Sequence, residues 1–166
     1  MLAHDLRLVA DYNQFYVWDA GVGPRAPEDY RDDDVIRMVK VAPNVVVVQP
    51  ASDVFVSVRL EVHDGDPGCD IAGWDHVVEC SLELPTGHLQ VHECTGGAAL
   101  DLHLAPGTYR VRALFEGLDS LSATGAAGDD RYVVVLWPGE AQPLRVLKQF
   151  PISRLGRVDA AGRLPS

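Results

Sequence analysis

The sequence predicts an all-β fold, an antiparallel β-sandwich of about eight to nine strands with one short helix near 31–39. Apolar and polar side chains alternate along most of the chain, and a side-chain period of two is typical of half-buried strands. Fifteen glycines and eleven prolines separate these segments, as expected of turns between short strands. No strand–helix–strand succession indicates a parallel sheet. A barrel is the alternative to the sandwich.

The clearest pair of strands lies in residues 98–115, where two alternating runs are separated by Ala105-Pro106-Gly107. In one geometry the chain forms a tight hairpin here, and Leu104 faces Tyr109. In the other the chain passes between two sheets, and the Leu-x-Pro-Gly-x-Tyr pattern forms a tyrosine corner, in which a buried tyrosine hydroxyl bonds to backbone upstream. A type II turn twists unfavourably for a two-residue hairpin, which favours the corner. Both geometries place Leu104, Tyr109 and Val111 in the core.

The N-terminal half begins with a strand region at 6–19. Its buried parity changes near residues 11–13, which predicts a bulge or a break into two strands. A loop rich in glycine and proline follows at 20–31. The segment 32–40 is expected to include one or two helical turns, because its acids come first and Lys40 comes last, as suits the helix dipole. The next strands are expected at 44–49 and 54–62.

In the second half, the alternating segments 75–84 and 87–93 are expected to form a hairpin. The register that pairs apolar residues with one another also sets Glu79 beside His92 on the polar face, which is the reason to prefer it. A loop without periodicity is expected at 116–130. The last strands are expected at 131–137 and 142–150.

The length of 166 residues is sufficient for one domain with its own core. We expect a single β-sandwich domain at 1–150 and a C-terminal tail at 151–166. The three cysteines are irregularly spaced and no secretory signal is evident, so we expect reduced thiols and a cytoplasmic location. No apolar run reaches the length of a membrane helix.

The charge balance is strongly acidic, with 24 acidic and 14 basic residues and a formal net charge of -10. This excess disfavours direct binding to nucleic acid or to an anionic membrane, because both are negatively charged. It is compatible with a basic protein partner, and it also favours solubility by itself.

No pattern in the sequence indicates a catalytic or metal site, so we expect no enzyme activity and no cofactor. No serine lies in a Gly-x-Ser-x-Gly motif. His88 and His92 share a strand face but stand about 13 Å apart, too far to hold one ion, and Glu79 with His92 offers only two ligands. The acidic turn at 64–70 has alternating carboxylates, as in a calcium loop, but no glutamate closes it.

Aromatic and acidic side chains near the N-terminus form the candidate partner-binding surface. The polar and aromatic residues of the first strand region alternate with Phe15 and Val17, and exposed tyrosine and tryptophan beside acids are typical of protein interfaces. The alternative is that the second sheet and the 20–40 loop cover this face. The predicted surface consists of Tyr12, Gln14, Tyr16, Trp18, Asp32, Asp33 and Asp34.

Two fragments resemble a known family. The fragment 11–17, Asp-Tyr-Asn-Gln-Phe-Tyr-Val, is similar to the opening Tyr-x-Gln-Phe-x-Val strand of the competence protein J family. The fragment 102–109, Leu-His-Leu-Ala-Pro-Gly-Thr-Tyr, resembles that family's Leu-Pro-x-Gly-x-Tyr turn. The resemblance implies a small cytoplasmic bacterial β protein that binds and inhibits a non-specific DNA-entry nuclease, with no catalytic residue to carry over. This chain is longer, with an extra acidic loop at 64–75 and a C-terminal tail, so its partner need not be a nuclease.

The favoured hypothesis is therefore a non-enzymatic protein that binds a basic protein partner, such as a nuclease, as an inhibitor or immunity-type protein. An acidic surface can imitate phosphates and speed association with a basic site. The alternative is a sandwich that binds a small ligand or calcium with the 64–75 loop. A hydrolase whose site is assembled in space is a third hypothesis, and a homodimer through an edge strand is compatible with each of them.

Overall fold

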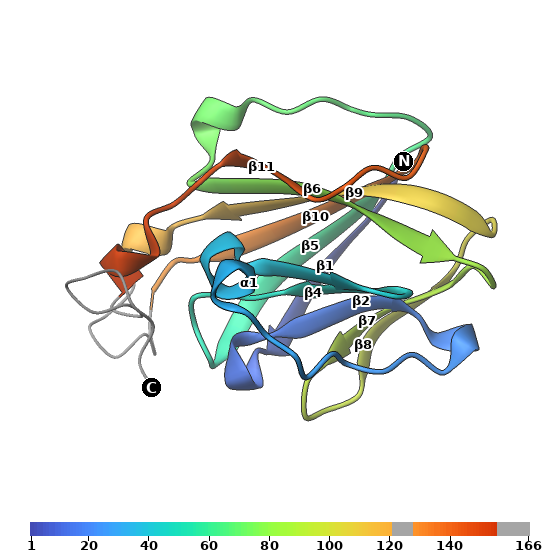
Figure 1. The fold of residues 1–166 in the computed structure, drawn as a ribbon, viewed down its shortest axis with the longest axis horizontal. Coiled ribbons are helices and arrows are strands. Elements are labelled where there is room, and N and C mark those ends of the chain that lie inside the picture. The colour runs from blue at the N-terminus through green and yellow to red at the C-terminus, as the bar shows by residue number, and fades with distance from the viewer. Residues whose placement is uncertain (121–127, 156–166) are drawn as a thin grey trace.

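Two β-sheets pack face to face in the computed structural model, which describes residues 1–120 and 128–155 (Figure 1). Sheet A has six strands, in spatial order β1 (Leu2–Val9), β5 (Phe55–Val62), β10 (Arg131–Pro138), β9 (Gly107–Glu116), β6 (His76–Leu84) and β11 (Arg145–Lys148). Sheet B has five, in the order β3 (Val39–Ala42), β4 (Val45–Val48), β2 (Phe15–Asp19), β7 (His88–Glu93) and β8 (Ala98–His103). The helical segments of the described residues are α1 (Asp32–Arg37) and the short 3-10 helices η1 (Asp11–Asn13), η2 (Ala20–Val22), η3 (Ile71–Gly73), η4 (Leu118–Ser120) and η5 (Ile152–Leu155).

The predicted all-β sandwich is confirmed, with two corrections. The described residues form six and five strands in the two sheets, rather than eight or nine in all, and the sheets do not close into a barrel. Sheet A is mixed, because β10 pairs in parallel with β5 and antiparallel with β9. A parallel pair requires a long connection, and here the chain forms β6, β7, β8 and β9 before it returns beside β5.

The core lies between the sheets and follows from the alternation of each strand. In β5, Val56, Val58 and Leu60 are buried, as predicted from their spacing. Each such side chain contributes roughly 1.5–3 kcal/mol when it leaves water completely. Phe150 and Ile152 also belong to this core, although they follow the last strand.

The predicted break near residues 11–13 is confirmed, and it arises because the chain changes sheets there. β1 belongs to sheet A and β2 belongs to sheet B. Leu8 and Ala10 are buried in the core from the first sheet, and Phe15 and Val17 from the second. The buried parity therefore has to change between the two strands.

The chain also changes sheets between β8 and β9, as the tyrosine-corner geometry requires. The Tyr109 hydroxyl donates a hydrogen bond to the Ala105 carbonyl at 2.7 Å. Tyr109 and Val111 are buried, and Leu104 is half-buried against the same core. The tight hairpin is excluded, because β8 pairs with β7 whereas β9 pairs with β6 and β10.

The hairpin expected from 75–84 and 87–93 is wrong. β6 pairs with β9 and β11 in sheet A, whereas β7 pairs with β2 and β8 in sheet B. Glu79 consequently lies opposite Arg112 rather than beside His92. The apolar residues of both segments face the core in either arrangement. The hydrophobic pattern therefore could not distinguish a hairpin from a crossing between sheets.

A buried aspartate holds this crossing in place. Asp19, at the end of β2, is 0% exposed and accepts hydrogen bonds from the Thr86 N–H at 2.7 Å, from the Thr86 hydroxyl and from the Gly21 N–H at 2.8 Å. Burial alone would raise the pKa of Asp19, but these hydrogen bonds hold it below the ordinary value. Next to Thr86, Gly87 has a φ of +74°, and a Cβ there would lie 2.0 Å from the Leu104 carbonyl oxygen. The crossing therefore requires glycine at this position.

The helix predicted within 32–40 is confirmed as α1, which ends at Met38 in a left-handed conformation with a φ of 61°. β3 begins at the next residue, so Val39 and Lys40 of the predicted segment belong to a strand. Residues 121–127 and 156–166, which include part of the expected loop and most of the expected tail, lie outside the described residues. Within the part of the chain that is described, no helix is long and apolar enough to cross a membrane.

Candidate functional site

The turn η1, which connects the two sheets, holds Tyr12 away from the protein. Tyr12 and Asn13 both have left-handed backbone, with φ values of 58° and 54°, a conformation that costs a non-glycine residue roughly 1–3 kcal/mol. The Asn13 amide donates to the carbonyls of Pro50 and Ala51, at 3.3 and 3.1 Å, and thereby fixes the turn. The Tyr12 side chain is consequently accessible, with 76% of its surface exposed.

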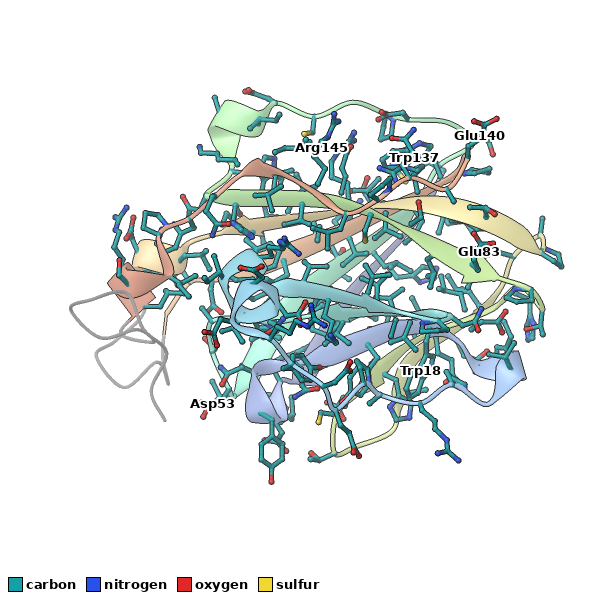
Figure 2. All side chains as sticks on the ribbon, in the orientation of Figure 1. Trp18, Asp53, Glu83, Trp137, Glu140 and Arg145 are labelled. Carbon is teal, nitrogen blue, oxygen red and sulfur yellow. The ribbon has the colours of Figure 1, made fainter. Side chains whose placement is uncertain are left out.

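Acidic side chains gather at the same end of sheet B. Phe15, at the start of β2, pairs with Val48 at the end of β4, and Val48 pairs with Val39 at the start of β3. The turn η1, the helix α1 and the loop after β4 therefore lie at one end of the sheet, and Figure 2 shows Asp53 of that loop at the lower left. We call this surface the acidic end, and define it by the exposed residues Tyr12, Asp32, Asp33 and Asp53.

Asp34, the third acid of α1, has internal partners. Its carboxylate accepts hydrogen bonds from the Arg31 N–H at 2.8 Å and from the Lys40 ammonium at 2.9 Å. Burial would raise the pKa of Asp34, but these interactions hold it below the ordinary value. Asp33 lies 3.9 Å from the Arg37 guanidinium, and its side chain is 72% exposed. Asp34 thus anchors the helix, whereas the other two acids of its first turn face solvent.

Tyr16 and Trp18 of β2 lie on the outer face of sheet B, where the chain covers Tyr16. Tyr16 is 4% exposed, packs against Tyr30 and stacks on the half-buried Trp18 with ring centroids 5.1 Å apart. The hydroxyls of Tyr16 and Tyr30 both donate to the Gln14 side-chain oxygen, at 2.9 and 3.2 Å. Burial raises the pKa of Tyr30 to about 12. An exposed Tyr16 was expected, and the structure instead has the covered alternative, with the cover supplied from the predicted 20–31 loop.

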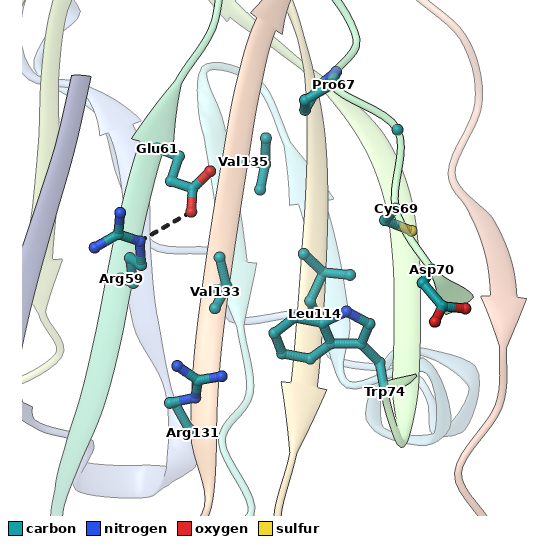
Figure 3. Close-up of a pocket in the computed structure, with 11 residues that line it drawn as sticks. Arg59, Glu61, Pro67, Cys69, Asp70, Trp74, Leu114, Arg131, Val133 and Val135 are labelled. Atoms are coloured by element: carbon teal, nitrogen blue, oxygen red, sulfur yellow. Dashed lines mark hydrogen bonds and ion pairs between the residues drawn. The ribbon is translucent and has the colours of Figure 1, made fainter. Parts of the chain in front are cut away.

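A cavity of about 330 Å³ lies on the outer face of sheet A, beneath the loop between β5 and β6 (Figure 3). Its apolar floor consists of Leu114, Val133 and Val135. Arg59, on one side, is bonded to Glu61 at 2.9 Å. Arg131 pairs with Glu116 and lies 5.7 Å from the ring centre of Trp74. Both cations at this cavity therefore already have carboxylate partners, which weakens the small-ligand alternative.

Arg112 ties the acidic loop at 64–75 to sheet A. Its guanidinium donates to both carboxylate oxygens of Asp66, at 3.0 and 3.2 Å, and to Glu79 at 2.8 Å. These bonds from Arg112 lower the pKa of Asp66. Asp70 accepts a hydrogen bond from a backbone N–H of η3 at 3.2 Å. These two carboxylates thus serve an ion pair and a helix cap, an arrangement that gives no support to calcium binding.

The cysteines carry free thiols in this structure. Cys80 is 1% exposed in the core, as predicted, and burial raises the pKa of its thiol to about 12. A thiol with such a pKa stays protonated near neutral pH and is a poor nucleophile.

One convergence of polar side chains was missed by the sequence reasoning. Because β8 pairs with β7, His103 lies opposite His88, and Asp101 lies opposite Gln90. The sequence reasoning paired the 87–93 segment with 75–84 and did not consider its pairing with 98–103. The signal that could have found it is the matched spacing of two polar positions, two residues apart, on neighbouring strands.

Comparisons with known proteins identify the fold. The sequence matches no protein-family model and no curated protein. Among solved structures, the chain is similar to ComJ from Bacillus subtilis, described as an inhibitor of the DNA-degrading activity of NucA, with a TM-score of 0.62 and 13% identity over 84% of this chain and 96% of ComJ. It is also similar to the protein of crocagin biosynthetic gene J, with a TM-score of 0.55 and 20% identity over 84% of this chain and 100% of that one. The resemblance inferred from two sequence fragments is confirmed as a likeness of fold.

Proposed function

We propose that this protein is a non-enzymatic binding protein that docks on a basic protein partner through its acidic end and acts as an inhibitor. The partner class that the ComJ-like fold suggests is a DNA-degrading nuclease. The observation that carries the proposal is the exposed Tyr12, which a left-handed turn holds outward at the end of sheet B. Three exposed aspartates lie at the same end of the sheet.

Two physical properties support the proposal: an exposed aromatic side chain that can bury against a partner, and the negative electrostatic field of the aspartates. Tyrosine is enriched among interface residues of high binding energy, because its ring is large and rigid and its hydroxyl can bond. The fixed turn already orders the Tyr12 backbone, so binding loses little further backbone entropy there. Aspartates have the charge sign of DNA phosphates, and such a field raises association rates with a basic cleft roughly 10- to 1000-fold at low salt.

The predicted surface residues divide by role in this proposal. Direct contact with the partner is assigned to the exposed residues Tyr12, Asp32 and Asp33. A supporting role beneath that surface is assigned to Gln14, Tyr16 and Asp34, whose side chains bond within the chain. Trp18, the remaining predicted residue, bonds to Gln90 on β7 and is assigned no part in the docking surface.

The experiment begins with the full chain immobilised as bait for a lysate of its source, at low salt and at about 0.5 M salt, where surface charge is heavily screened. Captured proteins are identified by mass spectrometry, and NucA is included as a purified candidate. Each partner is then tested in a DNA-degradation assay. We expect a basic nuclease that is lost at high salt and inhibited by this protein.

Three variants locate the surface by binding kinetics. Tyr12→Ala is expected to raise the dissociation rate about 30-fold, the equivalent of about 2 kcal/mol for a dominant interface residue. Asp32→Lys is expected to slow association and flatten its salt dependence. Asp64→Lys is the matched control, because it makes the same charge change at an exposed residue of the loop over sheet A.

Two results would contradict the proposal. If Asp64→Lys slows association as much as Asp32→Lys, net charge alone is responsible and the acidic end is not the docking surface. If no captured protein is salt-sensitive and no nuclease is inhibited, the inhibitor role itself is wrong.

A further inference from the structure

Two imidazoles and one carboxylate converge on the outer face of β7 and β8. His88 lies directly opposite His103, and their rings stack with centroids 4.6 Å apart. The Leu104 N–H donates to the Gly87 carbonyl one step along, so His88 and His103 occupy a non-hydrogen-bonded pair, where opposed side chains lie closest. Asp101 shares their face of the sheet, because it is two residues from His103.

The three candidate ligand atoms are close enough to hold one metal ion. His88 Nε2 lies 2.8 Å, and His103 Nε2 4.0 Å, from Oδ1 of Asp101. One ligand atom from each residue lies within 4.8 Å of the other two. Zinc–nitrogen and zinc–oxygen bonds of about 2.0–2.1 Å in a tetrahedron separate neighbouring ligands by about 3.3–3.4 Å. The two measured separations bracket this value, so rotamer adjustments of exposed side chains suffice.

Hydrogen bonds behind the carboxylate set its orientation. The Trp18 indole N–H donates to Gln90 Oε1 at 3.2 Å. This bond fixes the amide so that Gln90 Nε2 donates to Oδ2 of Asp101 at 2.8 Å. The other oxygen, Oδ1, is thereby turned toward the two imidazoles. Outer partners that orient a ligating carboxylate in this way are usual in metal sites.

We propose that His88, Asp101 and His103 form a zinc-binding site on the outer face of sheet B. Two imidazoles and one carboxylate are a ligand set that zinc accepts, whereas calcium and magnesium prefer sets made of oxygen alone. The His103 side chain is 79% exposed, so a fourth position is open to water or to a further ligand. The site does not rest on the proposed function, because it lies at the opposite end of β7 from the acidic end.

The test is calorimetric titration of the full chain with zinc chloride after removal of metals with a chelator. One zinc ion per chain is expected for the wild type, with at least tenfold weaker binding for His103→Ala and for Asp101→Asn. His63→Ala is the matched control, because His63 with Glu61, at 2.8 Å, is another histidine–carboxylate pair and has only two ligands. Thermal unfolding of each variant checks that the fold is retained, as expected for exposed side chains.

Unchanged affinity in His103→Ala and Asp101→Asn would overturn the assignment, as would loss of binding in His63→Ala alone. No zinc binding to the wild type would overturn it directly. Calcium chloride is titrated in parallel, and an equal response to calcium would indicate general attraction to an acidic surface rather than this site.

Discussion

Glu79 is the central group of a buried charge network, and its replacement by glutamine is expected to destabilise the protein strongly. The carboxylate is 8% exposed, and its Oε2 atom accepts the Arg112 Nε–H at 2.8 Å. Oε1 lies 3.5 Å from Arg145 and 3.8 Å from Arg110. Figure 2 shows Arg145 and Trp137 on the upper layer, and the Arg112 guanidinium stacks 4.7 Å from the centre of the Trp137 ring. Three guanidiniums therefore lie within 4 Å of one buried carboxylate.

The magnitude follows from the burial of these partners. Glu79→Gln keeps the shape of the side chain but removes its charge, so the buried guanidiniums lose their shared counter-ion. Breaking a buried pair in this way costs about 3–5 kcal/mol. At 2–4 °C per kcal/mol for a chain of this size, Tm is expected to fall by roughly 6–20 °C.

Asp66→Asn is the matched control, because it removes the other carboxylate that binds Arg112. The Asp66 side chain is 51% exposed, so water screens its charge and the loss is expected to be only about 0.2–1 kcal/mol. Urea denaturation at pH 7 measures both variants against the wild type. The reasoning is refuted if Glu79→Gln costs less than about 1 kcal/mol, or if Asp66→Asn costs as much as Glu79→Gln.

Two further substitutions test the places where the chain changes sheets. Asp19→Asn is expected to cost about 1–3 kcal/mol at pH 7, because the hydrogen bonds from Thr86 and Gly21 lose their charged acceptor. The pKa of Asp19 is lowered in the folded state. The contribution of Asp19 to the free energy of unfolding is therefore present above the ordinary aspartate pKa and is lost as the pH falls through the lowered value. In urea titrations, the stability difference between Asp19→Asn and the wild type should disappear below about pH 4. Tyr109→Phe removes the hydrogen bond to the Ala105 carbonyl and is expected to cost about 0.5–1.5 kcal/mol, measured by the same denaturation; a variant as stable as the wild type would deny the corner an energetic role.

The strands could be predicted from the sequence because water on one side and the core on the other impose an alternation on each of them. The same reasoning found the break at 11–13, where the buried parity changes. It failed at 85–87, because Leu82 and Leu89 face the core whether the two segments pair or cross between sheets. The residues of β5 and β10 give no sequence signal for their parallel pairing either, because that pairing depends on where a strand distant in the chain returns to the sheet. Tyr16 was expected to be exposed for a different reason: alternation shows which face of a strand a residue occupies, but not that the following 20–31 loop folds back over that face.

The correct pairing of β7 also separates two roles that the sequence joined. Trp18 was predicted to bind a partner together with Tyr12, but its indole N–H bonds to Gln90, which in turn holds Asp101. Trp18 therefore belongs to the hydrogen-bonded row that leads to the two histidines, whereas Tyr12 stands at the other end of the sheet. A surface mutation at the acidic end leaves that row intact, and a mutation of His103 leaves η1 intact. The inhibitor proposal and the zinc site can consequently fail or succeed independently.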